Sequence, residues 1–230
     1  MKKSILTISI FVVSIFLSTY FIYKYTENRS VSVDKNIEHV DTSGITKLMV
    51  VAHPDDDFIW GGSHLMDDDY LVVCITCGVK KTRVLEFKEA MKKTNEKYIM
   101  LGYPDKTKGK RDDWSSVYTS ISSDLKKIID YKDWNLIVTH NPDGEYGHIH
   151  HKMTSEIVTN LSNKERLMYF GKYYKKENIP EDLPTISEKN KKIKREELIP
   201  IYASQGYSMD KFGHMFDYEN WRSYDEWNQE

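Results

Sequence analysis

Two groups of histidine and carboxylate side chains have the spacing of metal ligands. The first is Ala-His-Pro-Asp-Asp-Asp at residues 52–57, where one imidazole precedes three carboxylates. Neighbouring carboxylates repel one another unless a cation or solvent relieves the repulsion. His53 and Asp56 stand three positions apart across a proline turn, so both can face one ion. A helix start would favour one or two of these aspartates, but it leaves His53 unexplained.

The second group is Gly-Glu-Tyr-Gly-His-Ile-His-His at residues 144–151, where the pattern predicts the start of a helix. His148 and His151 are three positions apart and therefore share one helical face. A lone histidine there would most often be solvated or capping, but three within four residues favour a site. The two groups together match a catalytic zinc ion, which takes about three N or O ligands and keeps an open position for water.

Such a centre would supply the chemistry of hydrolysis. Zinc lowers the pKa of a bound water to roughly 7 and makes that water a nucleophile. A free carboxylate beside the ion could serve as general base, and a spare histidine could polarise a carbonyl or protonate a leaving amine. The residues alone therefore predict a metal-dependent hydrolase.

Apolar runs along the chain predict the strands that position these groups. The runs cover residues 47–52, 70–76, 135–139 and 166–170, and helical patterns between them cover residues 83–101, 117–128 and 147–161, the second with a serine cap at 115 or 116. This alternation predicts an α/β fold of Rossmann-like type, in which helices cover both faces of a mainly parallel sheet. Ligands bind at the carboxyl ends of strands in such sheets, and both histidine groups follow apolar runs.

The N-terminal segment predicts a membrane anchor. Residues 4–23 carry no charge, and a helix of that length spans about 30 Å, enough to cross a bilayer. No small-x-small cleavage site follows, so we expect an uncleaved transmembrane helix over residues 1–26. A polar linker over residues 27–46 and one compact domain over residues 47–230 follow. Lys2 and Lys3 favour a cytoplasmic N-terminus, hence a single-pass protein whose domain is extracytoplasmic.

Composition excludes some other functions. The net charge of −2 gives no support for nucleic-acid binding, and no protein partner is evident. Cys74 and Cys77 form a C-x-x-C pair at the end of an apolar run, and we interpret them as buried small residues rather than as a redox or zinc pair. The aromatic residues between positions 207 and 227 could form a lid over a sugar, or they could pack against the domain.

The paired motifs resemble those of the PIG-L (LmbE-like) family of zinc-dependent N-acetylglucosamine deacetylases. That family carries Ala-His-Pro-Asp-Asp-Glu, Gly-His-x-x-His and Tyr-x-Ser-Gln, which resemble residues 52–57, 147–151 and 202–205. The likeness covers roughly residues 47–205. It implies removal of the N-acetyl group from an N-acetylglucosamine-type sugar conjugate.

The resemblance also implies a role for eight residues of this chain. The ligands of Zn²⁺ would be His53, Asp56 and His151. The catalytic residues would be Asp55, as general base, and His148, which would stabilise the tetrahedral intermediate or act as acid. The contacts to the substrate would be Tyr146, Arg83 and Asp105.

Two departures from the family pattern bear on the site. Asp57 replaces glutamate and is one methylene shorter, which puts the supporting role of that carboxylate in doubt. His150 stands where many relatives carry an aspartate that could orient the catalytic histidine, so we expect His148 to be tuned differently.

Two alternatives stay open: another metal-dependent amidohydrolase on the same fold, and a non-catalytic glycan-binding protein. The presence of both Asp55 and His148 argues against the second, because binding alone needs neither a base nor an acid.

Overall fold

The computed structural model describes residues 35–229 of the 230-residue chain. The segment that the sequence assigns to a membrane anchor, residues 1–26, lies outside the described residues. Within residues 35–229, no helix is both long enough and apolar enough to span a bilayer.

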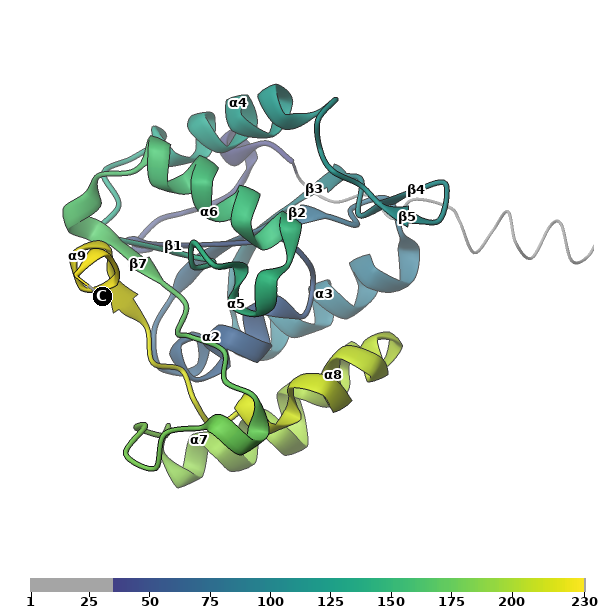
Figure 1. Ribbon diagram of the computed structural model, residues 1–230. Helices are drawn as coiled ribbons and strands as arrows, with labels where there is room; N and C mark the ends of the chain where they lie inside the picture. Colours follow the sequence, from purple (N-terminus) through teal and green to yellow (C-terminus); the bar gives the residue numbers. More distant parts are fainter. Residues whose placement is uncertain (1–34, 230) are drawn as a thin grey trace, which may run out of the picture.

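A six-stranded sheet forms the centre of the domain, in the order β3-β2-β1-β6-β7-β8 (Figure 1). The first five strands in that order are parallel, and β8 pairs antiparallel with β7. The strands are β1 (Lys47–Val51), β2 (Tyr70–Thr76), β3 (Lys97–Tyr103), β6 (Leu136–Thr139), β7 (Leu167–Tyr169) and β8 (Arg222–Ser223). The strand order reverses direction between β1 and β6, and in open α/β sheets this is where ligands bind beyond the carboxyl ends.

Helices cover both faces of the sheet, as the sequence predicts (Figure 1). One face packs against α2 (Asp56–Asp67) and α3 (Lys81–Thr94), and the other against α4 (Tyr118–Ile129) and α6 (Ile149–Leu161). Met49 and Val51 of β1 point into the first layer, whereas Leu48 and Val50 point into the second. Because both faces are covered, β1 and β2 are apolar without alternation.

The remaining elements are short. A hairpin of β4 (Lys106–Thr107) and β5 (Lys110–Arg111) follows β3. The short helices are α5 (Gly144–Gly147), α7 (Glu188–Ile193), α8 (Gly206–Phe212) and α9 (Tyr224–Asn228), with 3-10 turns at Ile37–His39, Lys164–Arg166, Lys176–Asn178 and Gly213–Met215. Two irregular helical segments, Lys194–Leu198 and Ile199–Gln205, connect α7 to α8.

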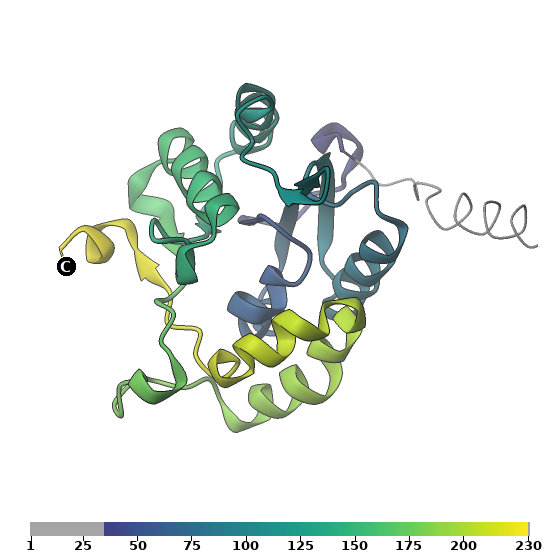
Figure 2. The ribbon, with the colours of Figure 1, turned by 45° about the vertical axis from the view of Figure 1, so that its right-hand side comes forward.

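The segment from α7 to α8 lies beneath α2 and α3 (Figure 2). A buried ion pair holds it there, with Lys194 Nζ 2.5 Å from Glu219 Oε1 and both side chains fully buried. Lys194 also donates to the carbonyl oxygen of Ile59 at 2.9 Å, and the Ser63 N–H of α2 donates to Glu219 at 2.9 Å. The pair therefore joins the C-terminal part of the chain to α2.

The prediction of one helix over residues 83–101 is wrong over its last part, residues 95–101. Helix α3 ends at Thr94, where Asn95 adopts the left-handed conformation at φ 65°, and β3 then begins at Lys97. The apolar spacing continues across the break because helix and strand face the same core. The Phe87 and Tyr98 rings, one from each element, lie 5.6 Å apart.

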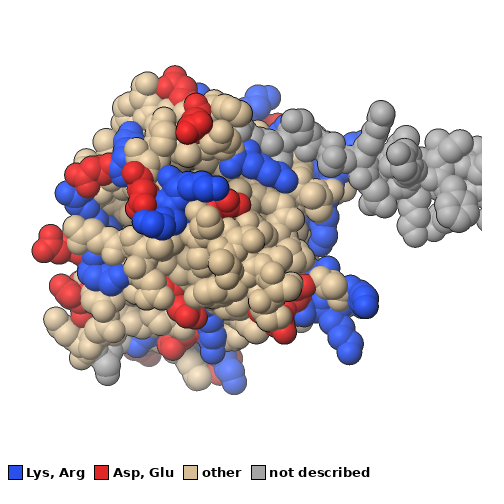
Figure 3. Space-filling view, turned by 90° about the horizontal axis from the view of Figure 1, so that it is seen from above, with Lys and Arg blue, Asp and Glu red and all other residues tan. Residues whose placement is uncertain are grey.

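Two smaller features also differ from expectation. Helix α4 starts at Tyr118 after Val117, without a side-chain cap, because the hydroxyl of Ser115 bonds Asp113 instead. Part of the predicted linker packs on the domain, since Ile37 and Ile45 are buried against the layer of α4. The outer face of that layer carries basic and acidic side chains interspersed with one another (Figure 3).

Candidate metal centre and active site

Both histidine groups meet in the crevice beyond β1 and β6. The loop after β1 carries His53 and leads into α2 at Asp55, which has an unusual positive φ of 132°. The loop after β6 turns sharply at Gly144, Glu145 and Gly147, which all have positive φ. Backbone strain of this kind, at the non-glycine residues Asp55 and Glu145, is frequent at functional sites.

The three predicted metal ligands form a nearly equilateral triangle of donor atoms. Asp56 Oδ2 lies 3.2 Å from His53 Nδ1 and 3.3 Å from His151 Nε2, and the two nitrogens are 3.3 Å apart. A tetrahedral zinc ion with bonds of about 2.0–2.1 Å requires donor atoms about 3.3–3.4 Å apart. The separations therefore fit one zinc ion on these three residues.

The hydrogen bonds of His151 leave its Nε2 lone pair free for an ion. His151 Nδ1 lies 2.5 Å from Glu145 Oε2, and an ionised carboxylate can only accept. The proton of a neutral His151 is therefore on Nδ1, and Nε2 faces the triangle. A carboxylate behind a metal-binding histidine fixes its tautomer and its orientation.

The tautomer of His53 is fixed by His150. His150 Nε2 donates to the carbonyl oxygen of Asp112 at 2.7 Å, so its Nδ1 carries a lone pair and accepts from His53 Nε2 at 3.1 Å. The proton of His53 is then on Nε2, and Nδ1 faces the triangle. The His150 ring is held by stacking on Trp114, with ring centroids 4.1 Å apart.

His140 supports the centre from behind. The Ala52 N–H donates to His140 Nε2 at 3.0 Å, and His140 Nδ1 donates to Glu145 Oε2 at 3.0 Å. Both ring nitrogens of His140 are therefore occupied, although His140 lies near Asp56 and His151. The His140 ring stacks on His151 with centroids 3.8 Å apart, so it holds the ligand ring in place.

The same reasoning excludes two other triples of neighbouring donors. His148 lies near His53 and His151, but its Nδ1 accepts the His150 N–H at 3.2 Å. Binding a cation through Nε2 as well would require His148 to become an anion. The triple of His53, Asp105 and His150 would use His53 Nε2, which already carries a proton.

The electrostatics of the triangle favour a positive charge at its centre. Burial alone would lower the pKa of His151, but Asp56 and Glu145 outweigh burial and raise it to about 10. Burial would also favour neutral Glu145, yet His140 and His151 outweigh it and lower the Glu145 pKa to about 2. Two buried carboxylates thus stabilise either a proton or a metal ion at this place.

Asp55 lies beside the triangle rather than in it. Arg83 Nη2 is 3.2 Å from Asp55 Oδ1 and also donates to the Pro54 carbonyl oxygen. Burial raises the pKa of Asp55 to about 6, against the opposing effect of the Arg83 charge. A carboxylate with this pKa can both take up and release a proton near neutral pH.

Asp57 connects the first motif to the Tyr-x-Ser-Gln motif. Tyr202 donates its hydroxyl to the Asp57 carboxylate, with oxygens 2.7 and 2.9 Å away, and the Asp55 N–H donates to Asp57 Oδ1 at 3.0 Å. Burial raises the Asp57 pKa to about 7. The shorter side chain of Asp57 therefore still positions the Asp55 backbone.

His148 caps the start of α6, and its ring is 4.5 Å from the ring of His151. Burial, followed by the nearby His151 and His53, lowers the pKa of His148 far below its usual value, so the ring is neutral. Since Nδ1 accepts the His150 N–H, the proton of His148 is on Nε2. This N–H can donate a hydrogen bond.

A cavity of about 790 Å³ opens over these residues. Seven of the eight predicted site residues line it: His53, Asp55, Asp56, Arg83, Asp105, Tyr146 and His148. The eighth, His151, is fully buried. Neither Glu145 nor His140 is among the site residues predicted from the sequence. The signal for Glu145 was a carboxylate within six residues of a candidate ligand.

The family model described as PIG-L, GlcNAc-PI de-N-acetylase, matches residues 48–162. The chain belongs to the PIG-L family. The matched residues include the donor triangle, Asp55 and His148. The PIG-L resemblance drawn from the motifs is therefore confirmed. Tyr202 lies outside the matched residues.

One relative is a protein of Acanthamoeba polyphaga mimivirus called L374, which is uncharacterised. It is 29% identical over an alignment of 133 residues, and the match covers 50% of this chain and 57% of the viral protein. The chain thus spans little more than half the length of this relative.

Three solved structures share the fold. The A40926 pseudoaglycone deacetylase Dbv21 has a TM-score of 0.54 at 16% identity, covering 72% of this chain and 84% of its own. A deacetylase of teicoplanin biosynthesis has a TM-score of 0.55 at 15% identity, covering 72% and 87%. The 4-carboxy-2-hydroxymuconate hydratase GalB of Pseudomonas putida KT2440 has a TM-score of 0.52 at 13% identity, covering 74% and 83%. Because GalB is a hydratase, the fold alone does not determine the reaction.

Proposed function

We propose that this PIG-L protein is a zinc-dependent hydrolase that removes the N-acetyl group from an N-acetylglucosamine-type sugar conjugate. The observation that carries the proposal is the donor triangle of His53, Asp56 and His151, with sides of 3.2–3.3 Å. The description of the family model, GlcNAc-PI de-N-acetylase, supports an N-acetylglucosamine-type substrate. The two deacetylases that share the fold support removal of an acyl group of this kind.

Zinc is the ion that best fits the donor set. Two neutral imidazoles and one carboxylate are ligands of catalytic zinc sites, and the separations suit its tetrahedral geometry. When bound, the ion would polarise the amide carbonyl and lower the pKa of water in the open coordination position.

Asp55 would act as the general base. It lines the cavity next to Asp56 but has no place in the donor triangle, and its pKa is raised to about 6 by burial. Arg83 holds one oxygen of the carboxylate at 3.2 Å. Asp55 would take a proton from the attacking water and pass it to the departing nitrogen, so that acetate and a free amine leave.

His148 would stabilise the charge that develops on the carbonyl oxygen. Its Nε2–H is the free donor, and burial keeps the ring neutral. A preorganised donor of this type stabilises the transition state more than the substrate. Tyr146, whose ring lies 5.8 Å from that of His148, forms the neighbouring part of the cavity wall.

The direct test is acetate release by the purified protein from a panel of N-acetylglucosamine conjugates. Chelator should abolish release, and stoichiometric zinc should restore it. Excess zinc is avoided, because the teicoplanin deacetylase Orf2, which shares the fold, has a zinc-inhibited form. Release from other N-acetyl compounds but from no sugar would indicate a different amidohydrolase. Zinc binding without any release would contradict the proposal.

A location outside the cytoplasm, on a membrane anchor formed by residues 1–26, is proposed from the sequence alone. Intact mass and membrane fractionation of the native protein test it. A mature chain starting near residue 25 would convert the anchor into a signal peptide.

A further inference from the structure

We propose that the mouth of the cavity binds an anionic group, a phosphate or a carboxylate, carried on the N-acetylated substrate. This inference rests on the proposed function and names the class of its substrate. It follows from the basic side chains at the mouth, from the start of α3, and from the buried Nε of Arg83. The short distance between Asp105 and His53 then limits where the charge of the substrate can lie.

Basic side chains are concentrated where the cavity opens. Lys80, Lys81, Lys106 and Arg111 all line it. The chain as a whole has 33 basic and 35 acidic residues, so composition does not explain this concentration. The face above α4, by contrast, carries both signs interspersed (Figure 3).

One carboxylate at the mouth neutralises only part of this charge. Asp105 lies 3.4 Å from Lys80 Nζ and also pairs with Arg111. Among the residues that the structure describes, Lys81 and Lys106 have no ion-pair partner. Of the other carboxylates of the cavity lining, Asp55 pairs with Arg83 and Asp56 is a predicted metal ligand. Positive charge therefore remains for a ligand.

The first turn of α3 adds hydrogen-bond donors at the same place. This 14-residue helix starts at Lys81, and its capping residue Lys80 makes no side-chain hydrogen bond to it. No acidic residue lies in its first turn, where a negative charge would be favoured. The unpaired N–H groups of a helix start attract anions, and Lys81 and Thr82 line the cavity.

A third observation comes from Arg83 in the same turn. The residue is only 8% exposed and lines the cavity, yet its Nε has no hydrogen-bond partner. A buried donor without an acceptor costs free energy unless a ligand or water satisfies it. A ligand with several acceptor oxygens would meet this requirement.

The position of Asp105 limits how far the anion lies from the acetyl group. Its Oδ1 is 3.4 Å from Nε2 of His53, so the basic cluster adjoins a predicted metal ligand. A substrate whose amide reaches the metal centre can therefore place a charged group near Lys80 and Arg111 only if that group is close to the sugar ring. The expected substrate is a sugar phosphate or sugar acid, rather than a neutral sugar with a distant charge.

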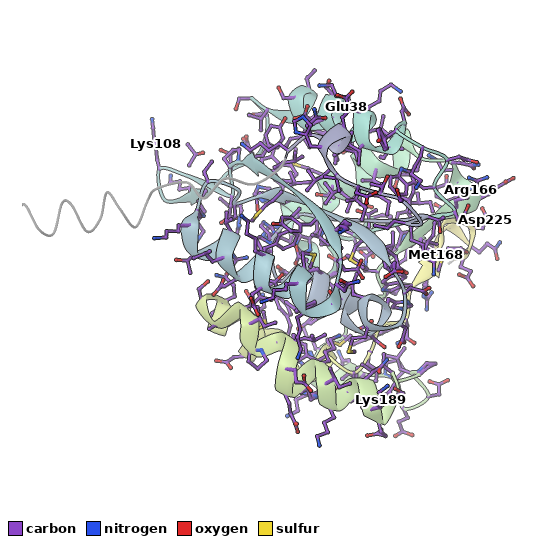
Figure 4. The ribbon with its side chains drawn as sticks, turned by 180° about the vertical axis from the view of Figure 1, so that it is seen from behind. Glu38, Lys108, Arg166, Met168, Lys189 and Asp225 are labelled. Carbon is purple, nitrogen blue, oxygen red and sulfur yellow. The ribbon has the colours of Figure 1, made fainter. Side chains whose placement is uncertain are left out.

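The test compares neutral and anionic substrates in three proteins. The substrates are methyl N-acetyl-β-glucosaminide, N-acetylglucosamine 1-phosphate, N-acetylglucosamine 6-phosphate and N-acetylmuramic acid. The test variant is the charge reversal Lys81→Glu with Lys106→Glu. The control is Lys108→Glu, on the same hairpin, whose side chain points away from the domain and does not line the cavity (Figure 4). The two phosphates distinguish the position of the charge, and N-acetylmuramic acid tests a carboxylate.

We expect the wild-type protein to prefer an anionic substrate, and the double variant to lose about ten-fold in kcat/KM for it through KM. Activity on the neutral glycoside and all activities of Lys108→Glu should change by less than about two-fold. Glutamate at the start of α3 suits the helix, so folding should persist. If this charge-reversal variant does not fold, the neutral double variant Lys81→Gln with Lys106→Gln replaces it.

Binding without catalysis separates this inference from the proposed function. Calorimetry with glucosamine 6-phosphate and glucosamine 1-phosphate on the chelator-treated protein should show weaker binding in the double variant, and weaker binding at high salt. If no substrate releases acetate but binding depends on these lysines, the proposed function fails and the anion site at the mouth of the cavity stands. Equal binding by all three proteins, or equal loss for neutral and anionic substrates, would overturn it.

Discussion

His150 Nδ1 lies 3.1 Å from Nε2 of the predicted metal ligand His53. The backbone N–H of the same residue donates to His148, the predicted catalytic histidine, at 3.2 Å. Position 150 thus bonds the predicted metal ligand through its side chain and the predicted catalytic histidine through its backbone. Replacing the side chain should therefore disturb metal binding more than the orientation of His148.

We predict that His150→Phe weakens zinc binding by roughly 10- to 100-fold, the usual effect of losing a residue that orients a metal ligand. Phenylalanine preserves the stacking on Trp114 but removes the acceptor for His53. Competition with a chromophoric chelator measures the affinity. His150→Asn, which can still accept, should recover part of it. Wild-type affinity in the phenylalanine variant would show that His53 needs no partner.

Each of the three residues of the donor triangle should be essential for the metal. Single replacement of His53, Asp56 or His151 by alanine should abolish both zinc content and activity, because a three-ligand site cannot spare one. Elemental analysis of the purified variants decides the question. Exposed His39, outside the cavity lining, provides the matched control as His39→Ala. Full zinc occupancy in any triangle variant would remove that residue from the ligand set.

Asp55→Asn should separate catalysis from binding. Asparagine keeps the shape of the aspartate side chain and removes its basicity. We expect full zinc content and a loss of at least ~10²-fold in single-turnover rate. In the wild-type protein the Asp55 pKa of about 6 predicts that activity falls as the pH drops below 6, because a protonated Asp55 cannot accept. Loss of zinc in this variant would make Asp55 a ligand instead.

Glu96 predicts a pH dependence of stability that is independent of the active site. Burial, with a smaller effect of Asp69 and Asp68, raises its pKa to about 8 in the folded protein, against the bond from the Tyr70 N–H. The unfolded value is about 4.3, so the stabilisation from protonated Glu96 is complete below that pH and is lost as the pH rises through 8. Glu96→Gln keeps an acceptor for Tyr70 and should remove this slope. Urea unfolding of both proteins at several pH values measures it, and parallel profiles would refute the assignment.

The sequence was sufficient to predict that the two histidine groups meet, because the parts of each group are local, whereas the choice of His53, Asp56 and His151 as ligands followed from the family resemblance and stays a prediction. His53 and Asp56 share one turn, and the helical spacing of the second group places His151 beside His148. The rule that ligands bind at strand ends then brought the two groups together. The helices on both faces likewise followed from unbroken apolar runs.

The supporting residues could not be predicted, because their roles depend on contacts between distant segments. His150 reaches the Asp112 carbonyl oxygen across 38 positions, and Tyr202 reaches Asp57 across 145. Glu145 meets two histidines only because its own backbone adopts φ 52° and ψ −78°. Strand β3 was missed because Tyr98 prolongs the helical spacing of Phe87 and Met91. Only the left-handed Asn95 interrupts it.

The docking of the C-terminal segment on α2 has a consequence for the order in which the site matures during synthesis. The residues of the donor triangle and Glu145 have all been translated by residue 151. Tyr202, which bonds Asp57, and Glu219, which forms the buried ion pair with Lys194, follow later. Ribosomes add residues from the N-terminus, so Asp57 has no Tyr202 partner until 145 further residues have been added. The backbone that carries Asp55 therefore gains this support only late in synthesis.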